Sequence, residues 1–206
     1  MVHFRTVTVV NTGVLSEDHA FRYSLTRRWD ATLQKLLVIM HNPSKATEVL
    51  NDDTVMACQN IAWLIGDRTH PDRISTHVVD GLPQFGSIRV CNLFPAFATN
   101  KDLLTLPSSN VLHENDCEVA RSCAWADKII CAWGKPKRTD REDYIRQIVR
   151  TETEHVLCFG HQGGHPMHPR QVKQLEKSEF PSYLLRNDSI STERRLLYRL
   201  RNWDIG

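Results

Sequence analysis

The stretch LLVIMHNPS, residues 36–44, decides the fold of this chain of 206 residues. Its first five residues, Leu36 to Met40, are all apolar and do not alternate with polar ones, which is typical of a strand buried on both faces. Three further runs are apolar or nearly so: Ile88 to Cys91, in which Arg89 is the one charged residue, Ile129 to Trp133 and Val156 to Phe159. The four runs predict parallel strands that helices cover on both sides.

Helical patterns separate these runs. Residues 54–65 place apolar side chains on one face, and Gly66 suits the position after such a helix. We expect further helices over residues 109–125, after a capping box at residues 139–142, and over residues 192–203, where the pattern is basic and amphipathic. Alternating strands and helices predict an α/β fold, with three α/β/α layers around a central, mostly parallel four-stranded sheet.

The N-terminal residues show a different pattern. The β-branched stretch from Phe4 to Val10 ends at Asn11-Thr12-Gly13, which predicts an edge strand and a turn. Residues 21–25 alternate and are expected to pair with that strand as a β-hairpin. Without repeats or a low-complexity linker, residues 1–206 are expected to form a single domain.

Composition excludes several classes of protein. Hydrophobic residues make up 41% and charged residues 24% of the chain, and the net charge is +2. No apolar run approaches the roughly 20 residues of a membrane span, and the N-terminus lacks the apolar segment of a signal peptide. The six cysteines form no Cys-x-x-Cys pair and lie mostly among apolar residues. We therefore expect reduced core thiols in a cytoplasmic protein that does not contact a membrane.

The segments that follow the four runs are rich in amides, imidazoles, glycine and proline. They are His41 to Ser44, Asn92 to Pro95, Gly134 to Arg138 and His161 to Pro169. Turns favour such residues, so one segment of this kind would mean little. Because parallel strands end at one edge of a sheet, where α/β folds bind ligands, four such segments predict a functional site there.

The side chains in these segments suggest particular chemistry. Asn42 cannot take up a proton, but its carbonyl oxygen can hold a water or a substrate group. The amide of Asn92 offers a donor and an acceptor that match the edge of a pyrimidine. Either His165 or His168 could donate a hydrogen bond to a developing anion. A plain turn at Asn42 and a loop-capping amide at Asn92 remain open alternatives.

Two acidic residues, Asp52 and Asp53, precede the helix expected at residues 54–65. We expect one of Asp52 and Asp53 to cap the following helix and the other, Asp53 in our assignment, to act as a general base.

The spacing of Cys158, His161, His165 and His168 resembles a set of metal ligands. Because two glycines interrupt this set and no second cluster completes it, we expect neither a metal nor a cofactor.

Positive charge is concentrated in three places. They are Arg22, Arg27 and Arg28; Lys135, Lys137 and Arg138; and Arg194, Arg195, Arg199 and Arg201. Each set by itself is typical of a solvated surface. The second set borders the predicted site, where it could contact phosphates without regard to base sequence.

Taken in order, these motifs resemble a known family. The motifs are Arg22-Tyr23-x-Leu25, His41 to Ala46, Asn51 to Thr54, Cys91 to Phe94, Ala132-Trp133-Gly134 and Gly164 to Pro169. The set resembles a bacterial and phage family known as domain of unknown function 1643, over about residues 20–170. More distantly, it is similar to the uracil-DNA glycosylase superfamily.

The second resemblance implies a fold and a reaction. Members of that superfamily have a parallel-sheet α/β/α fold and hydrolyse the N-glycosidic bond of a nucleotide that they flip out of duplex DNA. Asn42-Pro43-Ser44 looks like their water-orienting motif, with serine in place of glycine. His168-Pro169, or His165-Pro166 in a competing register, looks like their late His-Pro motif. The iron–sulfur cysteines of some branches have no counterpart in spacing here.

The same resemblance implies a role for each site residue. Asn42 would orient the attacking water and His168 would stabilise the departing base, with Asp53 as a further catalytic group. Residues that bind the base would be His41, Pro43, Ser44, Asn92, Phe94 and His165, with Phe97 as a second candidate for stacking. DNA would be held by Lys45, Lys135, Lys137, Arg138, Arg170 and Gln171. The expected substrate is duplex DNA that carries a modified pyrimidine, in defence against phages with hypermodified DNA.

Two other functions fit the same residues. The chain could process nucleosides or nucleotides, in which case it would lack the salt-dependent affinity for duplex DNA of a glycosylase. It could also be a DNA- or nucleotide-binding sensor without catalytic activity, because the sequence shows no clear general base.

Overall fold

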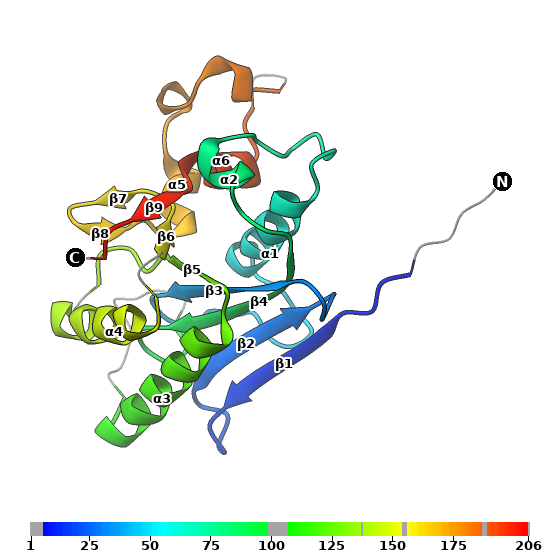
Figure 1. Ribbon diagram of the computed structural model, residues 1–206. Helices are drawn as coiled ribbons and strands as arrows, with labels where there is room; N and C mark the ends of the chain where they lie inside the picture. The colour runs from blue at the N-terminus through cyan, green and yellow to red at the C-terminus, as the bar shows by residue number, and fades with distance from the viewer. Residues whose placement is uncertain (1–5, 99–106, 137, 154–155, 187–188, 206) are drawn as a thin grey trace.

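The structure, a computed structural model, describes residues 6–98, 107–136, 138–153, 156–186 and 189–205 (Figure 1). Its strands are β1 (Val10–Leu15), β2 (Arg22–Arg28), β3 (Gln34–Met40), β4 (Phe85–Asn92), β5 (Lys128–Cys131), β6 (Val156–Cys158), β7 (His161–Gln162), β8 (His165–Pro166) and β9 (Arg201–Trp203). Its helices are α1 (Asp53–Gly66), α2 (His77–Asp80), α3 (Ser109–Trp125), α4 (Thr139–Glu152), α5 (Pro169–Gln174) and α6 (Thr192–Arg199). The prediction of an α/β fold is confirmed.

Seven strands form one mixed sheet in the order β1-β2-β4-β3-β5-β6-β9. The four apolar runs are β3, β4, β5 and β6, and neighbours among them are parallel. Strand β2 pairs antiparallel with β4, and β9 pairs antiparallel with β6. The predicted four-stranded sheet is therefore too small, because both ends of the chain extend it.

The N-terminal hairpin is shifted along the chain from its predicted place. Its first strand, β1, includes Asn11-Thr12-Gly13, which the sequence pattern assigned to a turn, whereas residues 6–9 have no regular structure. Gly13 suits this strand because the carboxylate of Glu48 lies where a side chain at position 13 would begin. The reversal follows at residues 16–20, where Ser16 and Asp18 hold the turn by hydrogen bonds.

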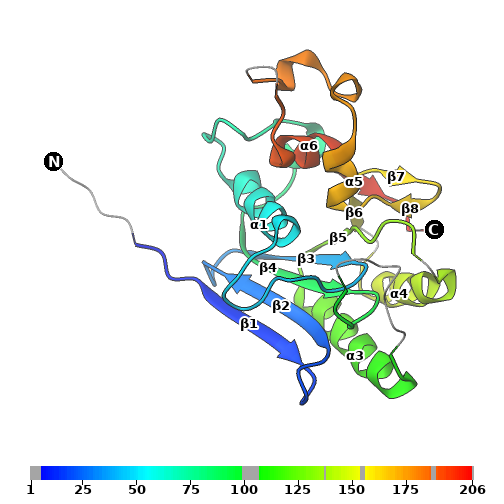
Figure 2. The ribbon, with the colours of Figure 1, turned by 180° about the vertical axis from the view of Figure 1, so that it is seen from behind.

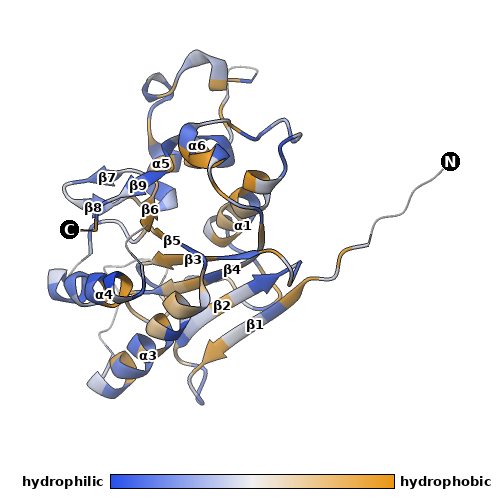
Figure 3. Cartoon of the chain, viewed as in Figure 1, coloured by the Kyte–Doolittle hydropathy of each residue, from blue (hydrophilic) through white to orange (hydrophobic). Residues whose placement is uncertain are grey.

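Helices cover both faces of the sheet (Figures 1 and 2). Leu36 and Val38 of β3 point to the side of α1 and α6, while Leu37 and Ile39 point to the side of α3 and α4. This explains why the strand is continuously apolar, and Figure 3 shows the hydrophobic colour on the central strands. Among the described residues, no helix is both long and apolar enough to cross a membrane.

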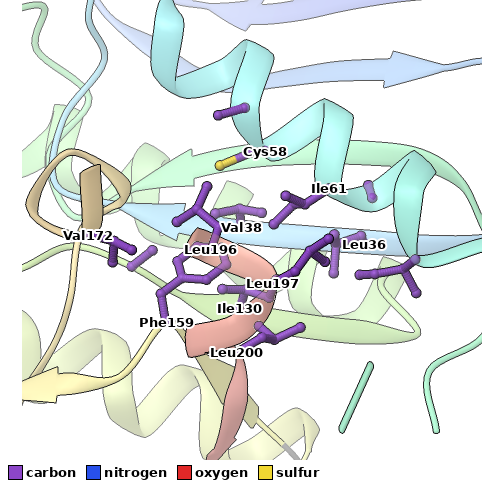
Figure 4. Packing of buried hydrophobic residues seen from close by; sticks show 14 of the residues in the cluster. Leu36, Val38, Cys58, Ile61, Ile130, Phe159, Val172, Leu196, Leu197 and Leu200 are labelled. Atoms are coloured by element: carbon purple, nitrogen blue, oxygen red, sulfur yellow. The ribbon is translucent and has the colours of Figure 1, made fainter. Parts of the chain in front are cut away.

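The C-terminal helix packs into the hydrophobic core, although its basic residues suggested a solvated surface. Helix α6 ends at Arg199, and its residues Leu196 and Leu197 pack with Ile61 of α1 in one apolar cluster (Figure 4). Arg194 is buried and donates hydrogen bonds to the carbonyl oxygens of Leu184, at 2.9 Å, and Pro71, at 3.1 Å. Arginines of this helix therefore hold loops together instead of forming a solvated surface.

The order of the parallel strands creates a crevice. From β3 the chain passes through α1 to β4 on one side, and it then passes through α3 to β5 on the other side of β3. Loops that follow β3 and β5 therefore leave the sheet in opposite directions. Such a switch point at the carboxyl ends of parallel strands is where open α/β sheets bind ligands.

Candidate functional site

A cavity of about 710 Å³ lies at this switch point. Its lining comes from the loops that follow β3 and β5, from the start of β2 and from the N-terminal ends of α1 and α5. The lining residues are Arg22, Met40, His41, Asn42, Ser44, Lys45, Asp52, Thr54, Val55, Ala98, Trp133, Gly134, Lys135, His168, Arg170, Gln171 and Gln174. Eight of the predicted site residues therefore meet at one place, namely His41, Asn42, Ser44, Lys45, Lys135, His168, Arg170 and Gln171.

The amide of Asn42 is held in one orientation. Its nitrogen donates to the carbonyl oxygens of Pro43, at 2.9 Å, and Ala98, at 2.6 Å. Its oxygen lies 3.0 Å from Nδ1 of His41, whose ring packs on the buried ring of Phe94 at a centroid distance of 5.3 Å. Because both N–H groups of the amide are used within the protein, the second lone pair of the carbonyl oxygen, beside the contact with His41, is the part of Asn42 that suits a ligand.

Asp52 and Asp53 have different surroundings. Asp52 lines the cavity, caps α1 by accepting from the backbone N–H groups of Thr54 and Val55 at 2.9 and 2.8 Å, and also accepts from the hydroxyl of Ser44. The side chain of Asp53 is 84% exposed and pairs with Lys173 at 3.4 Å. Asp53, the expected general base, therefore lies outside the cavity, and Asp52 is the aspartate within it.

The loop after β5 forms the opposite wall. Gly134 has a φ of +69°, and a side chain there would begin 2.8 Å from Oε1 of Gln171. The backbone N–H of Gly134 donates to the carbonyl oxygen of Pro166 at 2.8 Å, which fastens this loop to the segment after β6. Exposed Arg138 pairs with Asp140 and does not line the cavity, while Lys137 lies outside the described residues.

His168 caps the short helix α5. Its Nδ1 accepts a hydrogen bond from the backbone N–H of Arg170 at 3.1 Å, and Oε1 of Gln171 accepts from the backbone N–H of His168 at 2.8 Å. An imidazole that accepts at Nδ1 carries its proton at Nε2 when it is neutral. His168 therefore presents an N–H donor from a fixed ring.

The predicted base-binding residues Pro43, Asn92 and Phe94 do not line the cavity. Asn92 is fully buried, and its amide has no hydrogen-bond partner within the described part of the chain. It ends β4 next to Met40, which does line the cavity. Phe94 is buried beneath His41, so its ring has no exposed face for stacking, whereas Phe97 is 42% exposed.

His165 belongs to a separate buried network. Its Nδ1 lies 2.6 Å from the carboxylate of Glu142, which also accepts from Nε1 of Trp133 at 2.9 Å and from Arg146 at 2.7 Å. The predicted capping box at the start of α4 is absent, because Glu142 turns inward to these three donors. His165 is thus linked to Trp133 through Glu142 and does not line the cavity.

Sequence reasoning missed Arg22. A set of arginines among aromatic residues suggested a solvated surface, but Arg22 and Arg27 are 2% and 3% exposed. Arg27 donates to the carbonyl oxygens of Thr47, Glu48 and Leu50 and thus holds the loop before α1. The pattern Arg-Tyr-x-Leu alternates polar and apolar residues, which is typical of a strand with one exposed face. It therefore did not predict that Arg22 and Arg27 are buried.

A second and larger hollow, of about 1360 Å³, lies at the opposite edge of the sheet. It is bordered by Trp29, Trp63, His70 and residues 6–9, and none of the predicted site residues line it. In the described ranges no group of three or more His, Cys, Asp or Glu residues could hold a metal ion. The six cysteines are unpaired, and five of them are buried.

A family model described as "Protein of unknown function (DUF1643)" matches residues 22–170 of the chain. The matched region begins at Arg22 and ends at Arg170, so it includes every segment that lines the cavity except for Gln171 and Gln174. No curated protein and no solved structure matches the chain.

Proposed function

The chain belongs to the DUF1643 family of proteins of unknown function, and we propose that it is a DNA glycosylase that excises a modified pyrimidine. The observation that carries this proposal is the cavity at the switch point. It brings Asn42, Ser44, His168 and Gln171 together from segments more than 100 residues apart and surrounds them with cations. The distant resemblance to the uracil-DNA glycosylase superfamily supports the same reaction.

Hydrolysis begins with a nucleotide flipped out of the duplex into the cavity. The bond between C1′ of the sugar and the ring nitrogen of the base breaks, and its electron pair stays on the base. A water held by the carbonyl oxygen of Asn42 bonds to C1′, and one proton of that water ends on the released base. Since an amide is a poor proton acceptor, the reaction depends on a base that leaves readily.

His168 assists the departure of the base. A neutral imidazole with its proton on Nε2 donates a hydrogen bond to an oxygen of the base as negative charge develops there. The cap that fixes the ring, through Arg170 and Gln171, holds this donor in place. Ser44 lines the wall beside it, and Asp52 accepts a hydrogen bond from the hydroxyl of Ser44, while buried Pro43 restricts the backbone between Asn42 and Ser44.

Cations at the mouth of the cavity supply affinity for DNA. Lys45, Lys135 and Arg170 are exposed and line the cavity, so they are placed to contact phosphates on either side of a flipped nucleotide. Gln171 and Gln174 lie on the same side, on α5. Binding of this kind falls steeply with salt and is insensitive to base sequence.

The size of the cavity supports a modified base. A volume of about 710 Å³ lies well within the range of ligand pockets and exceeds what an unmodified pyrimidine ring needs. Gln171, Gln174 and Thr54 offer polar groups for a substituent. Excision of hypermodified bases from phage DNA is the biological role that we propose.

A strand-cleavage assay tests this function. Purified protein is incubated with duplexes that carry uracil, 5-hydroxymethyl pyrimidines or glucosylated cytosine, and alkali reveals abasic sites. We expect abasic sites on at least one modified duplex, and a loss of about 100-fold or more in rate with Asn42→Ala. Asn60→Ala, an exposed site on α1, is the matched control and should keep the full rate.

One observation favours a sensor as the second candidate. Asp52 is the single carboxylate that lines the cavity in the described part of the chain, and it is already engaged by Ser44 and two backbone N–H groups. Salt-dependent DNA binding without abasic sites on any duplex would support a sensor. Binding of free nucleotides without DNA binding would instead support a nucleotide-processing enzyme.

A further inference from the structure

The cavity contains a buried cation, the guanidinium of Arg22, that has no role in the proposed hydrolysis. Arg22, the first residue of β2, lines the cavity although it is only 2% exposed. One Nη donates to the carbonyl oxygen of Ala46, and the guanidinium lies 5.6 Å from the ring centroid of Phe97. Its Nε has no acceptor among the residues that the structure describes. A guanidinium N–H buried without an acceptor is costly, which points to an acceptor that a ligand supplies.

Arg22 differs from the other cations of the site. Lys45, Lys135 and Arg170 are exposed at the mouth, whereas Arg22 is enclosed. Burial lowers the pKa of Arg22, and the nearby carboxylates of Asp52 and Glu48 oppose that effect. Arginine keeps its charge even so, because its ordinary pKa lies far above neutral pH. The result is a fixed positive charge in a poorly hydrated part of the cavity, where it acts more strongly than the same charge at the mouth.

The neighbouring strand carries a second polar group that lacks partners. Asn92 ends β4, the strand with which β2 pairs, and neither atom of its amide has a hydrogen-bond partner in the described ranges. In the sheet it lies next to Met40, which lines the cavity. Arg22 and Asn92, which both have unpaired polar atoms in the described ranges, thus lie on adjacent strands at the edge where the parallel strands end, close to where the base would enter.

We infer that Arg22 binds the negatively charged ring of the departing base and so stabilises the transition state of bond breakage. The inference rests on the proposed function and names a further catalytic residue for it. When the bond from C1′ to the base breaks, its electron pair moves onto the ring, and a fixed cation in contact with the ring lowers the energy of that state. This assignment explains how a site with an amide in place of a carboxylate could drive the reaction.

The test uses two pyrimidines of similar shape and different charge. Barbiturate is an anion at neutral pH, whereas uracil is neutral, so their affinities report a preference for a charged ring. Binding is followed by the fluorescence of the protein, with Trp133 in the cavity wall, in the presence of a duplex with a stable abasic-site analogue. We expect barbiturate to bind at least about 10-fold more tightly than uracil to the unaltered protein.

Two variants assign the preference to one residue. Arg22→Gln should bind barbiturate and uracil equally, whereas Arg28→Gln, at an exposed site on the same strand, should keep the full preference. In case Arg22→Gln does not fold, the Nε–H signal of Arg22 in the unaltered protein, assigned with Arg22→Lys, provides a second measurement. That signal should shift when barbiturate is added and stay unchanged when uracil is added.

Three results would overturn the inference. They are equal affinity of the unaltered protein for both pyrimidines, a preference that survives Arg22→Gln, and competition by inorganic phosphate at Arg22 as strong as that of barbiturate. The last would make Arg22 a phosphate ligand. Failure of the glycosylase proposal is a separate result, because it would appear as an absence of abasic sites while barbiturate still bound through Arg22.

Discussion

At the scale of single residues, Gly134 holds together two walls of the cavity. Its φ is positive, and a side chain there would meet Oε1 of Gln171, which would have to move and so lose its hydrogen bond from the backbone N–H of His168. We expect Gly134→Ala to lower the free energy of unfolding by about 2 kcal/mol and to displace His168 through the broken cap. The matched control is Gly163→Ala, which has a φ of +58° but no atom near the added carbon and should cost about 1 kcal/mol. Urea unfolding of both variants measures the difference, and equal losses would contradict it.

Glu142 is a second residue whose surroundings decide its role. It is 2% exposed and accepts hydrogen bonds from Trp133, Arg146 and His165. Glu142→Gln removes the negative charge from a buried ion pair, which should cost about 3 kcal/mol of stability. Asp140→Asn breaks the exposed pair with Arg138 and should cost less than about 1 kcal/mol. Thermal unfolding compares the two, and a small effect at Glu142 would show that the network does not hold the loop.

Position along the chain predicted some site residues and could not predict others. Asn42, Ser44 and His168 follow apolar runs, so the rule for parallel strands placed them at one edge. Arg22 begins an antiparallel strand, to which that rule does not apply, and its burial depends on contacts with the distant loop at Ala46. The inward turn of Glu142, and with it the role of His165, likewise depends on three partners that only the folded chain brings together.

At the scale of elements, the C-terminal helix α6 is needed for the fold although it lies outside the matched family region. Leu196 is fully buried between α6 and the sheet. Leu196→Ala should therefore lower the free energy of unfolding by about 2 to 5 kcal/mol. Leu50→Ala, at a side chain that is 65% exposed, should change it by less than about 0.5 kcal/mol. Equal urea midpoints for the two variants would contradict a core role for α6.

The sequence pattern predicted most elements but not how the edges of the sheet are completed. Largely apolar runs identify β3 to β6, because burial on both faces leaves a strong signal, although the run in β4 contains Arg89. Strands β1 and β9 are partly exposed and contain Gly13 and Asn202, so they lack this signal and form through pairing with their neighbours.

At the scale of the whole molecule, buried cysteine thiols should make the free energy of unfolding depend on pH in alkali. Burial raises the pKa of Cys58, Cys91 and Cys123 to about 12, from an ordinary value near 9. Because the folded state keeps these protons longer than the unfolded state, their contribution to stability is complete below about pH 9 and is lost as pH rises towards 12. Each thiol should lower the free energy of unfolding by about 1.4 kcal/mol per pH unit in that window.

Urea unfolding under reducing conditions at pH 8, 9 and 10 measures this slope. Cys58→Ala removes one buried thiol and should make the decline less steep. A stability that does not change with pH between 8 and 10 would contradict the prediction.

The place of α6 in the core also has a consequence during synthesis on the ribosome. Leu36, Val38 and Ile130 are translated before Leu196 and Leu197, which pack in the same cluster. A nascent chain that has not reached these residues presents an apolar sheet face to solvent, so it should bind chaperones that hold unfolded polypeptides. Emergence of α6, and not that of the loops that line the cavity, would then be the step that completes this face of the core.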